Sequence, residues 1–192
     1  MSDCIWPLKN NKNLHMKILV CISSVPDTTS KINFTADKSA FDKNGIQWVI
    51  NPYDEFALTK AVKLQESQGA TVTIATVGDA ATEAVMRKAL AIGANDAIRV
   101  NTEPQDSITV AKELAKIAEE GGYDLVLCGK ESIDYNGAAV PAMIAQLLNR
   151  PFVNACVGLE VNGAEATAVR EIEGGKETLS VKLPAVIAGQ KG

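Results

Sequence analysis

The chain has 192 residues, 46% of them hydrophobic and 22% charged, which is enough length and apolar content for one buried core. Its net charge of −4 leaves no overall basic field, which argues against nucleic acid or anionic lipid as a partner. No apolar stretch reaches the roughly 18–20 residues that span a bilayer, so we expect a soluble, cytoplasmic protein without membrane insertion.

The first half of the chain predicts a buried strand, a hairpin arm and a helix. Residues 1–15 are polar and aperiodic and are expected to form a loose extension before an α/β domain at residues 16–192. The run KILVCIS (17–23) predicts a strand buried on both faces, followed by a turn at 24–27. A turn signal at 42–45 precedes a possible second strand at 47–50.

The segment NPYDE (51–55) has the features of a helix start, and the helix is expected to end near Gln68. Asn51 is predicted to cap the helix, and Pro52 suits the first helical position. Asp54 and Glu55 are interpreted as residues that complement the helix dipole.

From residue 71 the pattern alternates between strand and helix. Strands are predicted at 71–77, 97–100 and 124–128, and helices at 79–92, 106–120 and 139–148. This alternation is typical of βαβ units that build a mostly parallel sheet flanked by helices. In the tail, two alternating segments flank Glu173-Gly174-Gly175 and predict an antiparallel hairpin, after which an apolar strand follows at 182–187.

Three segments are predicted to meet at the carboxyl edge of this sheet, where open parallel sheets bind ligands: residues 21–24, 77–79 and 129–137. The last of these is rich in hydrogen-bonding groups, although an ordinary strand-to-helix loop is an equally good interpretation of it alone. Lys130 has the character of a phosphate-neutralising cation. Neither the P-loop motif GxxxxGK[ST] nor the dinucleotide-binding motif GxGxxG occurs, so a nucleotide would be bound by a different arrangement of residues.

The chain shows no catalytic or metal-binding pattern. Its cysteines, Cys4, Cys21, Cys128 and Cys156, are far apart, and its single histidine is His15. No GxSxG segment is present, so we expect no catalytic residues and no bond-breaking chemistry. Cys21 and Cys128 lie in apolar runs and are expected to be buried free thiols.

Between residues 16 and 187 the chain resembles the electron transfer flavoprotein beta subunit family. Five segments carry the resemblance, in family order: KILVCISSVPDT, NPYDEFAL, ALAIGANDAIRV, GKESIDYNGAAVPAMIAQLL and REIEGGKETLSVKLPAVI. The resemblance implies a Rossmann-like fold of the adenine-nucleotide hydrolase type. It also implies electron transport as a heterodimer with an alpha subunit that carries most of the redox FAD.

In this family the beta subunit holds AMP, and a second FAD takes its place in the electron-bifurcating branch. The forms of NPYDE and REIEGG favour AMP here. Carried over by position, the resemblance implies a cofactor-binding set at Cys21, Asn51, Pro52, Tyr53, Asp54, Val77, Gly78, Gly129, Lys130, Ser132, Ile133, Asp134, Tyr135, Asn136, Gly137, Ala138, Ala139 and Val140.

The chain departs from the family pattern in three places. Ser23-Ser24 replaces the basic residue that commonly follows the first strand, and residues 134–137 lack the fuller acidic and Asn/Gln-Thr-Gly pattern. The family's C-terminal docking loop and arm are expected to be missing, so docking to flavin dehydrogenases maps to no residue of this sequence. The alternative from another functional class is a small stress-type nucleotide-binding module that acts as a homodimer. A third hypothesis, a nucleotide-hydrolysing enzyme, has less support than the other two.

Overall fold

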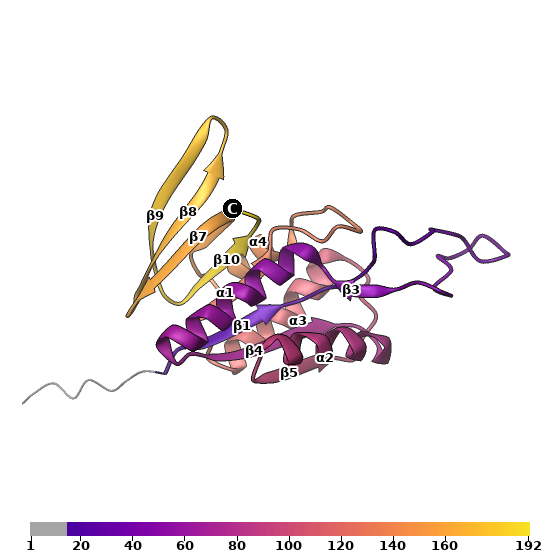
Figure 1. Cartoon of the computed structure of the whole chain (residues 1–192), viewed down its shortest axis with the longest axis horizontal. Coiled ribbons are helices and arrows are strands. Elements are labelled where there is room, and N and C mark those ends of the chain that lie inside the picture. The colour runs from indigo at the N-terminus through magenta and orange to yellow at the C-terminus, as the bar shows by residue number, and fades with distance from the viewer. Residues whose placement is uncertain (1–14) are drawn as a thin grey trace, which may run out of the picture.

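In the computed structural model, which describes residues 15–192, the parallel part of an eight-stranded sheet lies between two layers of helices (Figure 1). The strand order is β5-β4-β1-β6-β10-β7-β8-β9. The predicted mostly parallel sheet with flanking helices is therefore confirmed. Residues 1–14 of the expected N-terminal extension lie outside the described residues; the ring Nε2 of His15 lies 2.6 Å from Thr71 Oγ1.

The parallel strands lie on the predicted apolar runs, except that the last strand begins at Ala185 instead of the predicted residue 182. They are β1 (Lys17–Cys21), β4 (Thr71–Val77), β5 (Asp96–Val100), β6 (Leu125–Gly129) and β10 (Ala185–Gly189). The central strands β1 and β6 are almost fully buried because helices cover both faces of the sheet. Burial on both faces explains why these strands are continuously apolar rather than alternating.

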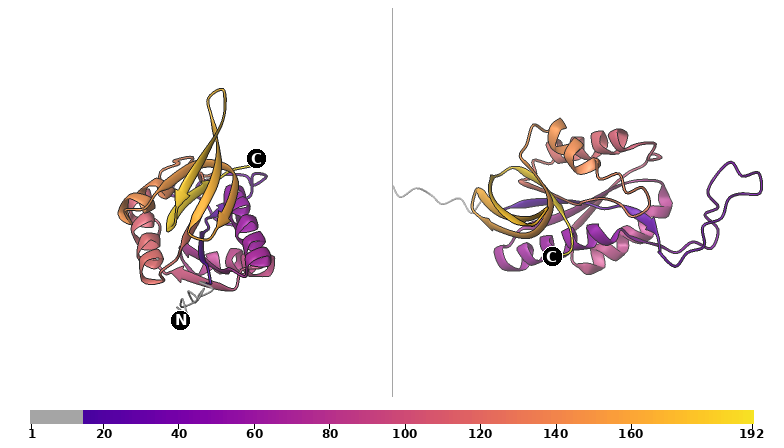
Figure 2. Two further views of the ribbon diagram at one scale, coloured as in Figure 1. Left: turned by 90° about the vertical axis from the view of Figure 1, so that its left-hand side faces the viewer. Right: turned by 90° about the horizontal axis from the view of Figure 1, so that it is seen from above.

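The helices divide evenly between the two faces of the sheet, as Figure 2 shows from the side. One face is covered by α1 (Pro52–Gln68) and α2 (Glu83–Ile92), and a short 3₁₀ turn (Ala80–Thr82) precedes α2. The other face is covered by α3 (Ser107–Glu120) and α4 (Val140–Leu147). Each helix buries an apolar stripe, and this burial supplies most of its stability.

The C-terminal part continues the sheet with antiparallel strands. Strand β7 (Phe152–Asn162) pairs in parallel with β10 and antiparallel with β8 (Glu165–Ile172), which pairs with β9 (Gly175–Lys182). These strands rise away from the helical layers in Figure 1, with the predicted hairpin turn at their tip. The side chain of Gln68, at the end of α1, donates a 2.9 Å hydrogen bond to the carbonyl of Val161 and so ties this extension to the body.

A second, two-stranded sheet corrects one prediction. Residues 24–26 form strand β2 (Ser24–Pro26) instead of the expected turn, because they pair with β3 (Trp48–Ile50), the predicted second strand. Val25 is completely buried in this pairing. The chain between the two strands forms the long arm at the right of Figure 1.

The strand order reverses between β1 and β6. From β1 the chain adds β4 and then β5 on one side, and it returns to place β6 against the other side of β1. The loops that leave β1 and β6 lead to helices on opposite faces of the sheet, the arrangement that forms a ligand crevice in open α/β sheets. Open α/β sheets bind their ligands at such a position.

Candidate functional site

Asp54 joins the carboxyl ends of the two central strands. One oxygen of its carboxyl group, Oδ2, accepts a 2.7 Å hydrogen bond from the backbone N–H of Ser23, just beyond β1. The other, Oδ1, accepts a 2.8 Å bond from the backbone N–H of Gly129, the last residue of β6. Asp54 lies in the first turn of α1, as the dipole interpretation requires, but it is only 4% exposed and both of its oxygens accept hydrogen bonds from other parts of the chain.

Burial has the largest effect on the pKa of Asp54. Removal from water raises the pKa of this carboxyl group to about 7, although the hydrogen bonds from Ser23 and Gly129 act to lower it. Among residues 15–192 no lysine, arginine or histidine forms an ion pair with it. A buried carboxyl group with a raised pKa therefore lies at the carboxyl ends of β1 and β6.

Asn51 holds the other side of the same site, and its predicted role as a helix cap was wrong. Its side-chain amide donates a 2.8 Å hydrogen bond to the carbonyl of Glu131, and its Oδ1 accepts a 3.2 Å bond from the backbone N–H of Ile133. No side-chain cap bond forms; only the backbone carbonyl of Asn51 accepts bonds from the first turn of α1. The fully buried amide is turned instead toward the loop that follows β6.

Gly129 allows α1 to begin close to the end of β6. A Cβ atom at this position would lie within 2.7 Å of Tyr53 Cβ and of the Tyr53 backbone, and would also meet the carboxyl group of Asp54. The next residue, Lys130, places its ammonium group 5.1 Å from the centre of the Tyr53 ring and 3.5 Å from the carboxylate of Glu131. The predicted site residues of the helix start and of the loop are therefore brought together.

The remainder of the loop leads to α4 with an unusual backbone. Asn136 and Ala138 have positive φ angles of 50° and 47°, a conformation that costs free energy for residues other than glycine. The backbone N–H of Asn136 donates to the carbonyl of Ser132. Within residues 15–192, the amides of Gly137, Ala138 and Ala139 have no hydrogen-bond acceptor, and they lie directly before the α4 N-terminus.

Residues 134–138 of this loop are exposed, and polar side chains of the loop bond locally. Ser132 and Asp134 are joined through their side chains, while Tyr135 is 84% exposed. Val140 is the first residue of α4, and Pro141 occupies the next position, so the missing proline N–H leaves no donor unpaired. The loop thus offers backbone donors rather than an array of fixed side chains.

The predicted contacts Val77 and Gly78 lie at the same edge but on the far side of β1. The backbone N–H of Gly78 donates to the carbonyl of Val100 on β5, and its carbonyl accepts a 3.1 Å bond from the guanidinium of Arg99. Arg99 also lies 3.5 Å from Glu83. The sequence analysis missed Arg99 because a single arginine within a strand has no motif around it.

Cys21 and Cys128 are buried free thiols, as predicted. They occupy neighbouring strands, and a hydrogen bond with the Cys21 side chain, together with burial, raises the pKa of the Cys128 thiol well above its usual value. A thiol whose pKa is raised in this way is a poor nucleophile and a poor metal ligand. Within residues 15–192 no group of three or more potential metal-ligating side chains occurs.

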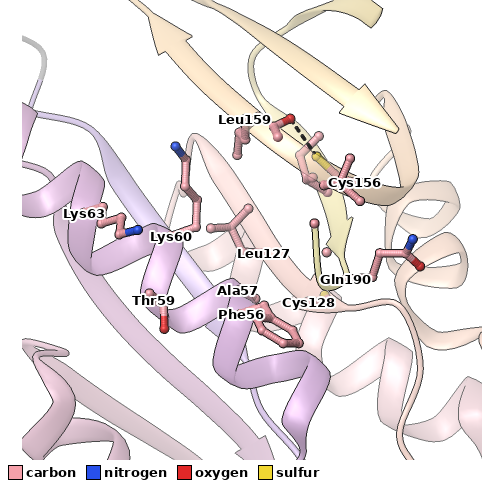
Figure 3. Close-up of a pocket in the computed structure, with 15 residues that line it drawn as sticks. Phe56, Ala57, Thr59, Lys60, Lys63, Leu127, Cys128, Cys156, Leu159 and Gln190 are labelled. Carbon is pink, nitrogen blue, oxygen red and sulfur yellow. Dashed lines mark hydrogen bonds between the residues drawn. The ribbon is translucent and has the colours of Figure 1, made fainter. Parts of the chain in front are cut away.

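A separate pocket of about 200 Å³ opens between α1, β7 and the end of β10 (Figure 3). Its apolar wall includes Phe56 and Leu159, and Lys60 and Lys63 stand at its rim. Cys156 also lines it, with its thiol hydrogen-bonded to the carbonyl of Gly158 at 3.1 Å. None of the residues predicted to hold a cofactor lines this pocket, although Cys128 at the end of β6 and Gly189 at the end of β10 do.

Comparison with known proteins places this architecture in a family. The model of the electron transfer flavoprotein domain matches residues 38–192. The chain is 34% identical to the electron transfer flavoprotein subunit beta of Bacillus subtilis over 181 residues, which cover 92% of this chain and 70% of that protein. The chain belongs to the electron transfer flavoprotein beta subunit family.

Relatives from eukaryotes are similarly close. The human subunit beta is 35% identical and the mitochondrial subunit beta of rice (Oryza sativa subsp. japonica) is 37% identical, each over 178 residues that cover 90% of this chain and 70% of the relative. The resemblance seen in the sequence motifs is therefore confirmed, and electron transfer is the activity for which this family is named. None of the helices in residues 15–192 combines the length and apolar character required to cross a membrane.

Proposed function

We propose that the chain binds AMP at the carboxyl edge of its sheet and pairs with an FAD-bearing alpha subunit, so that the heterodimer carries electrons from flavin dehydrogenases to an acceptor. The supporting observation is the pair of bridges made by Asn51 and Asp54. They bring two family motifs, NPYDEFAL and the loop after β6, together at the reversal of strand order. A nucleotide between them would contact both.

The unpaired amides before α4 suit the phosphate of AMP. Gly137, Ala138 and Ala139 present backbone N–H groups where the helix dipole also favours an anion. Lys130 adds a positive charge at the other end of the loop, although Glu131 partly balances it. The adenosine part would then lie toward the start of α1 and the ends of β1 and β4.

In this proposal AMP has a structural role. None of the buried groups around the crevice forms a nucleophile–base pair: the thiols of Cys21 and Cys128 are buried, and Asp54 is engaged by two backbone amides. The flavin supplies the redox chemistry, and this chain helps to hold and orient the subunit that carries it.

Co-expression with the alpha subunit, followed by denaturation and analysis of the released nucleotides, tests the proposal. One AMP and one FAD per heterodimer is the expected result. Two FAD molecules and no AMP would assign the site to the second flavin of the bifurcating branch. A colourless homodimer that binds ATP tightly would instead support the stress-type module.

The isolated chain should be colourless or nearly so, because the proposed redox FAD is held mainly by the other subunit. An absorbance spectrum of the purified chain between 350 and 500 nm, roughly the region where flavins absorb, is the measurement. A stoichiometric flavin spectrum would contradict the AMP assignment. We propose a cytoplasmic location, which fractionation of the source cells would test, since the rice relative is named as mitochondrial.

A further inference from the structure

The pocket between α1, β7 and the end of β10 lies beside an irregularity in the sheet. Between Val153 and Cys156, β7 has one residue more than the segment of β10 that faces it, from Ile187 to Gly189. Ala155, inside this bulge, has a positive φ angle of 52°. A bulge bends its strand and changes the direction of its side chains, and bulges are frequent beside functional sites.

The interior of the pocket is apolar. Leu127 and Ile187 face each other on β6 and β10, and Leu159 comes from β7. Phe56 projects from α1 and is 40% exposed, so part of its ring surface is open to a ligand (Figure 3). A dry apolar cavity of roughly 150 Å³ can hold benzene, so a pocket of about 200 Å³ has room for a somewhat larger hydrocarbon or aromatic body.

The charged side chains that line this pocket are all positive. Lys60 and Lys63 follow Phe56 at intervals of four and three residues, which places the three side chains on one face of α1. The lining includes no aspartate or glutamate, and within residues 15–192 neither lysine forms an ion pair. The carboxylate of Glu171, outside the lining, is engaged by the side chain of Gln190. Both ammonium groups are therefore available to an anion.

The charge of Lys60 acts on the inner wall of the pocket. Burial raises the pKa of the Cys156 thiol, and the positive charge of Lys60 acts in the opposite direction. The polar groups of Cys156 already have partners: the thiol donates to the carbonyl of Gly158, and the carbonyl of Cys156 accepts a 2.9 Å bond from the backbone N–H of Gln190. An apolar group that fills the pocket would leave these hydrogen bonds intact.

We propose that this pocket binds a small carboxylate with an apolar body, of the size of a medium-length aliphatic acid or a simple aromatic acid. The carboxylate pairs with Lys60 and Lys63, and the body packs against Phe56 and the leucines of β6 and β7. Sites for drug-sized ligands usually exceed about 300 Å³, so the volume here favours a smaller molecule. The inference goes beyond the proposed AMP site and does not depend on it.

Titration of octanoate into the full chain, followed by the backbone amide resonances, tests the site. The resonances of Gly158 and Gly189, which line the pocket, should shift along one saturating curve. Those of Ala138 and Ala139, before α4, should not shift. From butanoate to octanoate, the dissociation constant should fall by about fourfold for each methylene that enters the pocket. Octanol, which has the same chain without the charge, should bind more weakly than octanoate.

Three variants separate the charge from the apolar wall. Lys60→Ala should raise the dissociation constant of octanoate by up to about fivefold, the effect of one partly exposed ion pair, and leave that of octanol unchanged. Lys112→Ala removes an exposed lysine from α3, on the other face of the sheet, and should keep the wild-type affinity for both ligands. Phe56→Ala should weaken the binding of both octanoate and octanol.

Three results would overturn the proposal. Unshifted resonances of Gly158 and Gly189 at millimolar octanoate would show that the pocket does not bind this ligand. Equal affinities of the wild type for octanoate and octanol would exclude a role for the lysines. Shifts confined to residues 137–139 would place the carboxylate at the loop before α4 instead.

Discussion

The backbone N–H of Gly129 donates a 2.8 Å hydrogen bond to the carboxyl group of Asp54, which lies 75 positions earlier in the sequence. The contact brings the start of α1 against the end of β6 at the reversal of strand order. It requires a glycine, because α1 begins where a side chain at position 129 would have to lie.

Replacement of Gly129 by alanine should destabilise the protein. The added Cβ would overlap with Tyr53 and Asp54, and overpacking of this kind typically costs about 1–3 kcal/mol in the free energy of unfolding. Urea denaturation measures the change. Gly175→Ala is the matched control, since a Cβ at position 175 meets nothing within 4 Å. Equal urea midpoints for Gly129→Ala and the wild type would show that α1 can move away from β6 without cost.

Two substitutions of Asn51 distinguish its bridging role from a helix cap. Asn51→Ala should cost about 1–3 kcal/mol, because it leaves the partly buried carbonyl of Glu131 and amide of Ile133 without their partner. Asn51→Asp would preserve a cap, since aspartate caps as well as asparagine. It should nevertheless destabilise the protein, because it places a carboxylate against the Glu131 carbonyl. Wild-type stability of Asn51→Asp in urea at pH 7.5 would restore the cap interpretation.

The stability of the fold should depend on pH through Asp54. Its folded pKa of about 7 lies above the ordinary value of 3.8, so the folded state binds the proton more tightly than the unfolded state. The resulting stabilisation is complete below about pH 4 and is lost as the pH rises through 7. Between pH 5 and pH 8 this loss should reach about 2–3 kcal/mol in the wild type, as estimated from about 1.4 kcal/mol per pKa unit.

Urea denaturation of wild type, Asp54→Asn and Glu55→Gln at pH 5, 6.5 and 8 isolates this effect. The wild type and Glu55→Gln should share the decline, and Asp54→Asn should lack it. Exposed acids such as Asp37, whose pKa is lowered to about 2 by hydrogen bonds from Thr35 and Ser39, are common to all three proteins and cancel in the comparison. Parallel curves for all three would show that Asp54 does not titrate in this range.

Replacement of Gly137 by valine should weaken AMP binding while preserving the fold. A Cβ at this position meets only Ser107 Oγ, at 3.9 Å, so the folded protein has room for a larger side chain. The same side chain would crowd an anion that approaches the amides of residues 137–139. Calorimetry measures AMP affinity, and urea midpoints check the fold. Equal affinity in both proteins would place the phosphate elsewhere.

The order and type of most elements, though not of β2, could be predicted from the sequence, because they depend on local patterns. Apolar runs such as KILVC and TVTIATV are typical of strands that are buried on both faces of a sheet. The apolar residues of α3, which include Leu114 and Ala118, recur with the period of a helix. The carboxyl edge follows from the same patterns, since every parallel strand in such a sheet ends on one side. The motif NPYDEFAL and the start of the motif GKESIDYNGAAVPAMIAQLL meet at this edge.

The roles of individual site residues were decided by the tertiary structure. In sequence, Asn51 and Asp54 have the pattern of a cap and a dipole partner, and both roles are local. In the folded chain their side chains turn away from α1 and bind backbone groups of residues 23 and 129–133. No local pattern contains that information. A buried polar side chain forms hydrogen bonds with the groups that lie beside it in the folded chain. These groups are on β1 and β6, which become neighbours only after the chain has formed β4 and β5 and returned to the other side of β1.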